Sequence, residues 1–296
     1  MSPSILIATA DGLLLDGSPV AFEGRDVTSL ALDGDGWLAV VDRSEIHSVT
    51  SGWSTKLLGR TDGVDSVAAF GGVATVGTES ARIFTIGPAG IQADNRFDNA
   101  PDRDDWYTPW GGPPTVRSLD EGPDGTRWVN VHVGGVLVDD SSGWRQTMDV
   151  DNDVHQVIAH PTRPGAALAA AAVGVGWSTD LGVTWDWSKD GLHAHYARAV
   201  AVGGELVFVS VSRGPNGRDA GVYRGRLGEP FEPCDGIGRF HENIDTGWIA
   251  SGPGLVAVVG PTGVVFASSD GGNAWEEAFR VDRPRALAVI ARTGHS

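Results

Sequence analysis

Apolar and polar positions alternate along this chain in short runs separated by turns that contain glycine or aspartate. The turn Asp124-Gly125 is followed by one apolar run, Trp128 to Val133, and then by another, Gly135 to Val138. Runs of this kind are typical of β-strands joined by tight turns. No long stretch carries apolar residues at helical spacing. The pattern therefore predicts an all-β protein with little helix.

Two turns resemble each other and reveal a repeat. They are Ser178 to Trp185 (STDLGVTW) and Ser268 to Trp275 (SSDGGNAW), and they start two units of about 45 residues apart, the repeat length of propeller blades. Six such repeats can be found along the chain. They cover Val27 to Trp53, Asp65 to Asp94, Val116 to Trp144, Val154 to Trp185, Ala197 to Phe231 and Trp248 to Trp275.

The two ends of the chain supply one more blade. Pro284 to Arg292 has the pattern of an innermost strand, and Ile5 to Gly17 has that of a second and third strand. Pairing the termini in one blade closes the ring and removes two exposed sheet edges. The sequence thus predicts a single domain over residues 1–296, a seven-bladed β-propeller with four-stranded antiparallel blades.

The two repeated turns resemble the Asp boxes of BNR-repeat propellers, which include sialidases, sortilin-type ectodomains and photosystem II assembly factors. In such a turn Asp180 or Asp270 accepts hydrogen bonds from turn amides, a glycine takes a positive φ, and the tryptophan packs on the sheet. The turn joins the two outer strands, on the face opposite the loops that lead into the innermost strands. The resemblance predicts the fold; it does not select a function, because the family contains hydrolases, lyases and binding scaffolds.

Composition narrows the partners and the compartment. The chain has 42 Gly, 16 Pro and 11 Trp, and its 38 acidic and 22 basic residues give a formal net charge of -16. That charge disfavours nucleic acid and anionic membranes as partners. The single cysteine, Cys234, cannot form an internal disulfide, and the N-terminal residues do not resemble a secretion signal. We therefore expect a cytoplasmic protein.

The second position of each innermost strand is expected to face the central channel. Three arginines in this ring have the fork geometry that binds carboxylate or phosphate, so we predict a small anionic or sugar-like ligand. The alternative is that the arginines pair with Asp65 and with loop carboxylates. The ring consists of Thr28, Asp65, Arg117, His155, Arg198, Gly247 and Arg285.

Five of the eight histidines map to the same side of the predicted blades three to six. They are His132, His155, His193, His195 and His241. Converging histidines are candidate ligands for a divalent transition metal such as Zn, Cu, Fe or Ni, and Asp149, Asp151 and Asp153 precede His155 closely enough to add oxygen ligands. Two alternatives stay open: proton transfer or hydrogen bonding to a substrate, and simple capping of strand ends.

The longest connection, Asp94 to Thr115, carries a group of aromatic residues. Trp106, Tyr107 and Trp110 are candidates for a wall that stacks on a sugar or an aromatic ring. The alternative is that they only cover the mouth of the channel.

Tyr196 and Glu242 invite comparison with sialidases, whose chemistry uses a tyrosine nucleophile, an acidic partner, an acid/base aspartate and an arginine triad. Sialidase or not, Arg117, Arg198 and Arg285 are candidates to bind an anion. The chain lacks the Arg-Ile-Pro motif of those enzymes near its start, and it is predicted to have seven blades where sialidase domains have six. Asp11, Asp42 and Glu79 are weaker candidates for acid/base work.

Three functional hypotheses follow. The leading one is a His/Arg-rich pocket that binds a small anionic or sugar-like ligand in a metal-dependent hydrolase or lyase, with catalytic candidates His132, His155, His195, Tyr196 and Glu242. The second is a non-catalytic scaffold that binds a protein partner. The third is a metal-independent glycosidase, which a close pair of carboxylates would favour.

Overall fold

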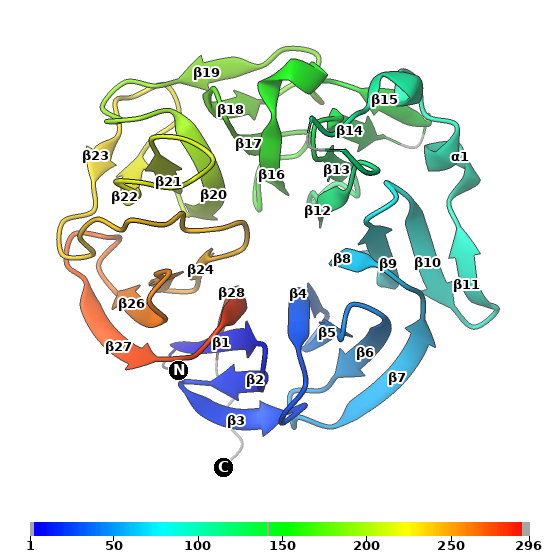
Figure 1. Cartoon of the computed structure of the whole chain (residues 1–296), viewed down its shortest axis with the longest axis horizontal. Coiled ribbons are helices and arrows are strands. Elements are labelled where there is room, and N and C mark those ends of the chain that lie inside the picture. The colour runs from blue at the N-terminus through cyan, green and yellow to red at the C-terminus, as the bar shows by residue number, and fades with distance from the viewer. Residues whose placement is uncertain (1–2, 110, 141, 292–296) are drawn as a thin grey trace. The chain divides into compact units, whose positions relative to one another are not determined.

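The computed structural model describes residues 3–109, 111–140 and 142–291, and these residues form seven four-stranded antiparallel sheets (Figure 1). The sheets are the blades of a β-propeller, so the predicted fold class is confirmed. In this described part of the chain, helix is limited to one short α-helix and two 3₁₀ turns. Within the described residues, no helix is long and apolar enough to cross a membrane. The chain divides into two compact units. The first unit consists of Met1–Val27, Ala172–Val175 and Trp187–Ser296, and the second consists of Thr28–Ala171 and Gly176–Asp186.

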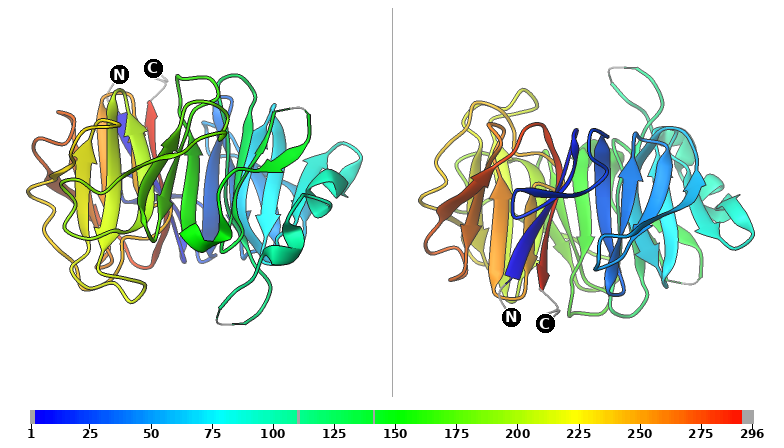
Figure 2. Two further views of the ribbon diagram at one scale, coloured as in Figure 1. Left: turned by 90° about the horizontal axis from the view of Figure 1, so that it is seen from above. Right: turned by 90° about the horizontal axis from the view of Figure 1, so that it is seen from below.

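In the first unit, the two ends of the chain share one blade. Strand β28 pairs antiparallel with β1, with Pro3 opposite Ala291 and Ile7 opposite Leu287, and the two strands run side by side in Figures 1 and 2. The predicted seventh blade is thus confirmed, and β3 completes it as the outermost strand. The strands are β1 (Pro3–Thr9), β2 (Gly12–Leu15), β3 (Ser18–Ala21), β20 (Tyr196–Gly203), β21 (Leu206–Ser212), β22 (Gly221–Gly225), β23 (Glu232–Pro233), β24 (Ile249–Gly252), β25 (Leu255–Val259), β26 (Val264–Ser268), β27 (Glu276–Arg280) and β28 (Pro284–Ala291).

The second unit contains the other blades, whose strands follow one another in chain order. The boundary between the units cuts through the last of these blades, at β18 and β19. The strands are β4 (Val27–Asp33), β5 (Gly36–Val41), β6 (Glu45–Val49), β7 (Thr55–Arg60), β8 (Val64–Phe70), β9 (Val73–Thr78), β10 (Ile83–Gly87), β11 (Gly90–Ala93), β12 (Val116–Glu121), β13 (Arg127–Val131), β14 (Gly135–Asp139), β15 (Trp144–Gln146), β16 (Val154–Ala159), β17 (Ala167–Ala171), β18 (Gly174–Ser178) and β19 (Asp186–Ser188).

Apolar side chains between neighbouring sheets hold each unit together. The middle strands are almost wholly buried, as in β14 and β17, because sheets packed face to face leave no solvated side. In the first unit one such cluster includes Ile5, Ile7, Val259, Val265 and Leu287. In the second unit one includes Phe97, Trp106, Val129, Leu137 and Trp144.

Both repeated turns, Ser178 to Trp185 and Ser268 to Trp275, join the third and fourth strands of a blade, β18 to β19 and β26 to β27. Asp180 Oδ1 accepts hydrogen bonds from the backbone N of Thr184 at 3.0 Å and from Ser178 Oγ at 2.8 Å. Asp270 Oδ1 accepts from the backbone N of Ala274 at 3.0 Å. These bonds lower the pKa of both carboxyl groups, that of Asp180 to about 2. The structural role predicted for the two aspartates is confirmed.

Two strand limits differ from the prediction. The run expected to extend from Trp128 to Val133 ends at Val131, because Val133 has a left-handed φ of 54° inside a turn. The innermost strand expected from Thr246 begins at Ile249, and Gly247 precedes it with a φ of 76°. Gly247 is therefore a turn residue.

The long connection after β11 is partly ordered by its own short helices, α1 (Asn95–Asp98) and η1 (Arg103–Asp105). Asp94 caps α1 by accepting from the backbone N of Phe97 at 3.1 Å. Helix α1 lies beside β11 in Figure 1. The segment is thus anchored to its blade by a cap and by the buried ring of Phe97.

Candidate functional site

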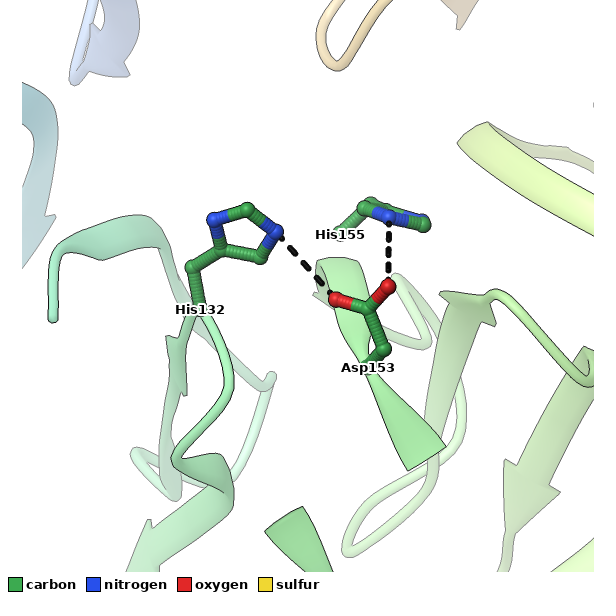
Figure 3. Close-up of side chains that lie close together, drawn as sticks. All are labelled: His132, Asp153 and His155. Atoms are coloured by element: carbon green, nitrogen blue, oxygen red, sulfur yellow. Dashed lines mark ion pairs between the residues drawn. The ribbon is translucent and has the colours of Figure 1, made fainter. Parts of the chain in front are cut away.

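Two histidines and an aspartate come together in the second unit (Figure 3). His132 Nε2 lies 3.2 Å from Asp153 Oδ1, and His155 Nε2 lies 3.6 Å from Asp153 Oδ2. The two imidazole rings are 5.6 Å apart, centre to centre. His155 is fully buried, while His132 and Asp153 keep some exposure. Of the five histidines predicted to converge, the structure brings His132 and His155 together, with Asp153 between them.

Local backbone geometry puts these side chains in place. His132 follows the last residue of β13 in the turn that leads to β14. Asp153 ends the 3₁₀ turn η2 (Val150–Asn152) with a φ of 48°, a conformation that few residues other than glycine, asparagine and aspartate adopt. Such backbone strain is common at functional sites.

The bulges of the first strands are a second local device. In four blades the register of the first strand shifts at the position that the sequence assigned to the channel. A bulge redirects a side chain and is common beside active sites. The shifts fall between Val64 and Ser66, Val116 and Ser118, Val154 and Gln156, and Ala197 and Val200, so they include Asp65, Arg117, His155 and Arg198.

The cluster has the spacing of a metal site. One ligand atom from each of the three residues lies within 4.8 Å of the others. Zn–N and Zn–O bonds of about 2.0–2.1 Å place tetrahedral ligands about 3.3 Å apart, close to the two His–Asp distances. In residues 3–109, 111–140 and 142–291, no other group of three His, Cys, Asp or Glu side chains has this spacing.

Charge and hydrogen bonding keep the central carboxylate ionised. Burial alone would raise the pKa of Asp153, but hydrogen bonds from His132 and His155 and the positive charge of the imidazoles hold it well below its usual range. An ionised carboxylate is the form that binds a cation, and the two imidazoles would have to give up the protons that face it.

Other charged groups continue the site towards the preceding blades of the same unit. Arg117 Nη1 lies 3.5 Å from His132 Nε2. Arg43 Nη2 donates to Asp65 Oδ1 at 3.0 Å and also to Glu79 Oε1. Burial raises the pKa of Asp65, and Arg43 and Arg117 partly oppose that shift. Asp65 and Glu79 therefore share one guanidinium, and Asp65 also interacts electrostatically with Arg117.

His193 lies in a different cluster, in the first unit. Its Nε2 is 2.8 Å from the carbonyl oxygen of Asp219, which can only accept, so Nε2 carries a hydrogen. Its Nδ1 is 2.7 Å from Arg239 Nη1 and 2.8 Å from the hydroxyl of Tyr223. Burial, and then the charge of Arg239, lower the pKa of His193. Both ring nitrogens are thus used inside the protein.

The remaining predicted residues of the first unit lie at strand starts and in loops. His195 and His241 are exposed, as is Glu242, and Tyr196 is half-buried at the start of β20. Tyr196 belongs to β20, whereas Glu242 lies in the connection between β23 and β24.

Two ring arginines of the first unit have acidic neighbours. Arg198 Nε lies 3.3 Å from Asp245 Oδ1, and Arg285 Nε donates to Asp26 Oδ1 at 2.9 Å. The alternative reading of the ring, in which arginines pair with loop carboxylates, thus fits these two residues.

Two aromatic residues of the long connection, Trp106 and Tyr107, differ in their exposure to solvent. Trp106 is only 7% exposed and belongs to the core, with its indole N donating to Gln146 Oε1 at 3.1 Å. It is therefore not an open stacking wall. Tyr107 is 47% exposed, and Trp110 lies outside the described residues.

Asp149 and Asp151 do not join the cluster of Asp153. Asp149 accepts from the backbone N of Asp151 at 2.9 Å and so caps η2. Both aspartates are exposed. Of the three, only Asp153 reaches the histidines.

Sequence reasoning missed Arg43, Tyr223 and Arg239. For Arg43 the sequence signal was its position directly after Asp42, a candidate at the end of a second strand. The structure shows that Asp42 and Arg43 form a tight turn with φ of 51° and 54°, where asparagine and glycine are usual. Tyr223 on β22 and Arg239 in a later loop had none, since only the folded chain brings them to His193.

Comparisons with known proteins support the fold and do not identify a function. No protein-family profile and no curated protein matches the sequence. A protein from Lactobacillus plantarum is similar with a TM-score of 0.63 and 15% identity, over 98% of this chain and 100% of the other. An ancestral GH74 enzyme has a TM-score of 0.62 and 14% identity, over 95% of this chain and 40% of its own. The computationally designed Ika8 protein is similar with a TM-score of 0.55 and 14% identity, over 88% of this chain and 75% of the other. Membership of the Asp-box family stays a prediction from the turns.

Proposed function

We propose that this propeller binds a divalent transition metal ion through His132, Asp153 and His155, and that the metal centre serves a hydrolase or lyase reaction on a small ligand. The observation that carries the proposal is the approach of three ligand atoms to within 4.8 Å at the ends of neighbouring strands. Two imidazoles and one carboxylate form a ligand set used by zinc and non-haem iron.

The ligand set leaves coordination positions open, which is the arrangement of catalytic rather than structural metal sites. A divalent metal in such a site supplies Lewis acidity and an activated water. The protein's own contribution is positional: the bulge at His155 and the left-handed backbone at Asp153 fix two ligands. His132 adds the third from the adjacent blade.

Metal content of the purified protein tests the proposal. The wild type is dialysed against Zn²⁺ and then against metal-free buffer, and bound metal is measured by plasma mass spectrometry. We expect about one equivalent in the wild type and at least a tenfold loss in Asp153→Ala and His155→Gln, because two ligands do not hold the ion as three do.

His47 provides the matched control. Its Nε2 lies 3.0 Å from Glu45 Oε2, so it forms a His–carboxylate pair in the same unit without belonging to the group of three. His47→Gln should keep the metal content of the wild type. Equal metal content in all four proteins, or none in any, contradicts the proposal.

A metal-independent glycosidase is the second candidate, and one observation favours it. Asp65 and Glu79 both accept from Arg43 and so form a close pair of carboxyl groups. Burial raises the pKa of Asp65, which is the direction that a general acid needs. Similarity to the GH74 enzyme adds only the fold. Treatment with a chelator separates the candidates, since glycoside hydrolysis that survives it does not use the metal.

A further inference from the structure

Arg117 stands beside the proposed metal ligands. Its Nη1 lies 3.5 Å from His132 Nε2, and the bulge in β12 falls at this residue. A guanidinium stays protonated and only donates, so its positive charge is permanent. A permanent cation so close to a metal ligand opposes metal binding by electrostatic repulsion.

Nearby carboxylates offset the two guanidinium charges but not the charge that a metal would add. Arg43 and Arg117 are balanced by Asp65 and Glu79, which lie near them. A metal that binds here would release the protons of His132 and His155, and Asp153 with two neutral imidazoles would then leave a divalent ion one positive charge in excess. A second ligand that is negatively charged would remove the excess.

Resting on the metal site proposed above, we infer that the centre takes an oxyanion, a carboxylate or a phosphate group, between the metal and Arg117, so that metal and anion bind cooperatively. The planar fork of arginine matches both kinds of group. Cooperativity is reciprocal: an anion that tightens metal binding is itself bound more tightly by the metal-loaded protein. The small ligand of this site is therefore acidic rather than a neutral sugar.

Cobalt titrations test the inference. The visible absorbance of Co²⁺ reports its coordination, and the titration is run in buffer without added oxyanion, with acetate, and with methylphosphonate. In the wild type we expect one or both anions to tighten Co²⁺ binding at least tenfold. Acetate alone assigns a carboxylate ligand, and methylphosphonate alone assigns a phosphate-like one.

Arg117→Gln should change the result in two opposite directions. Without an oxyanion its Co²⁺ affinity should exceed that of the wild type, since the repulsion is gone. With an oxyanion the gain should shrink to less than threefold. A merely structural role of Arg117 would lower affinity in every buffer. Arg117→Lys, which keeps the charge and loses the fork, should lie between the two.

Arg60→Gln is the charge-matched control. Arg60 forms an exposed pair with Glu45 at 2.7 Å on the outermost strand β7, and this variant should behave as the wild type. Co²⁺ binding without any oxyanion effect, or an equal effect in Arg117→Gln, overturns this inference and leaves the metal site intact. Absence of Co²⁺ binding in every buffer overturns both.

Discussion

The histidine cluster of the second unit and that of the first unit place the same residue type in different surroundings. Between His132 and His155 lies an ionised carboxylate that faces both rings. Around His193, a backbone carbonyl, a tyrosine hydroxyl and a guanidinium occupy both ring nitrogens. The first arrangement brings three side chains of metal-ligating type close together, whereas the second engages both ring nitrogens in hydrogen bonds to the protein. What surrounds a histidine, more than its position in a repeat, decides whether it is a candidate ligand.

The largest difference should appear in stabilisation by metal. Zn²⁺ at about 100 times its dissociation constant should raise the free energy of unfolding by about 2.7 kcal/mol in the wild type. His193→Ala should show the same gain, and His155→Gln should show almost none. Urea denaturation with and without Zn²⁺ measures the gain within each variant, so the intrinsic cost of each substitution cancels. An equal gain in both variants would abolish the distinction between the clusters.

A smaller effect of opposite pattern is expected without metal. Arg239→Ala removes a donor that lies 2.6 Å from the hydroxyl of Tyr223, a side chain only 2% exposed. We expect the free energy of unfolding to fall by about 1–2 kcal/mol, because a buried hydroxyl loses a partner. The His132 side chain is partly exposed. His132→Ala should therefore lower the free energy of unfolding by less than about 1 kcal/mol when no metal is present.

Tyr223→Phe makes this second result specific. In the phenylalanine background the hydroxyl is absent, so Arg239→Ala should cost less than it does in the wild type. The same cost in both backgrounds would mean that Arg239 acts through its stacking on the ring, 5.2 Å from the ring centre, and not through the hydroxyl.

The sequence was sufficient for the fold because each blade repeats the same local pattern. Turn residues such as Asp180 and Asp124 mark strand ends whatever the rest of the chain does, and even the divided seventh blade could be predicted from its two halves. Limits were less predictable at Val133 and Gly247, where the positive φ depends on the turn as a whole.

The candidate site was predictable only in part. The alignment of first strands picked out His155 and Arg117, and the structure adds the bulges that set these positions apart. A bulge depends on pairing with the next strand, which a single strand's sequence does not encode. Trp106 shows the converse: an aromatic residue in a long loop has the composition of a binding wall, but packing against Phe97 makes it core.

The smallest expected effect is a pH dependence of stability that belongs to the first unit's cluster. The pKa of His193 is lowered by burial and by Arg239, so the folded protein binds fewer protons there than the unfolded chain, whose histidine pKa is about 6.5. Stability due to His193 is therefore present above that pH and is lost as the pH falls below it. Asp120 contributes in the opposite sense, because burial raises its pKa to about 6 and the folded state gains a proton first as the pH falls.

The contribution of His193 must for this reason be measured as a difference between proteins. Urea denaturation at pH 5 and pH 7.5 should give a loss of stability on acidification that is smaller in His193→Gln than in the wild type, by less than about 1 kcal/mol given the partial exposure of the ring. The slope from Asp120 is common to both proteins and cancels. An identical pH dependence in the two proteins would show that His193 titrates alike in the folded and unfolded states. The contrast between the His193 cluster and the cluster of His132, Asp153 and His155 would then rest on metal binding alone.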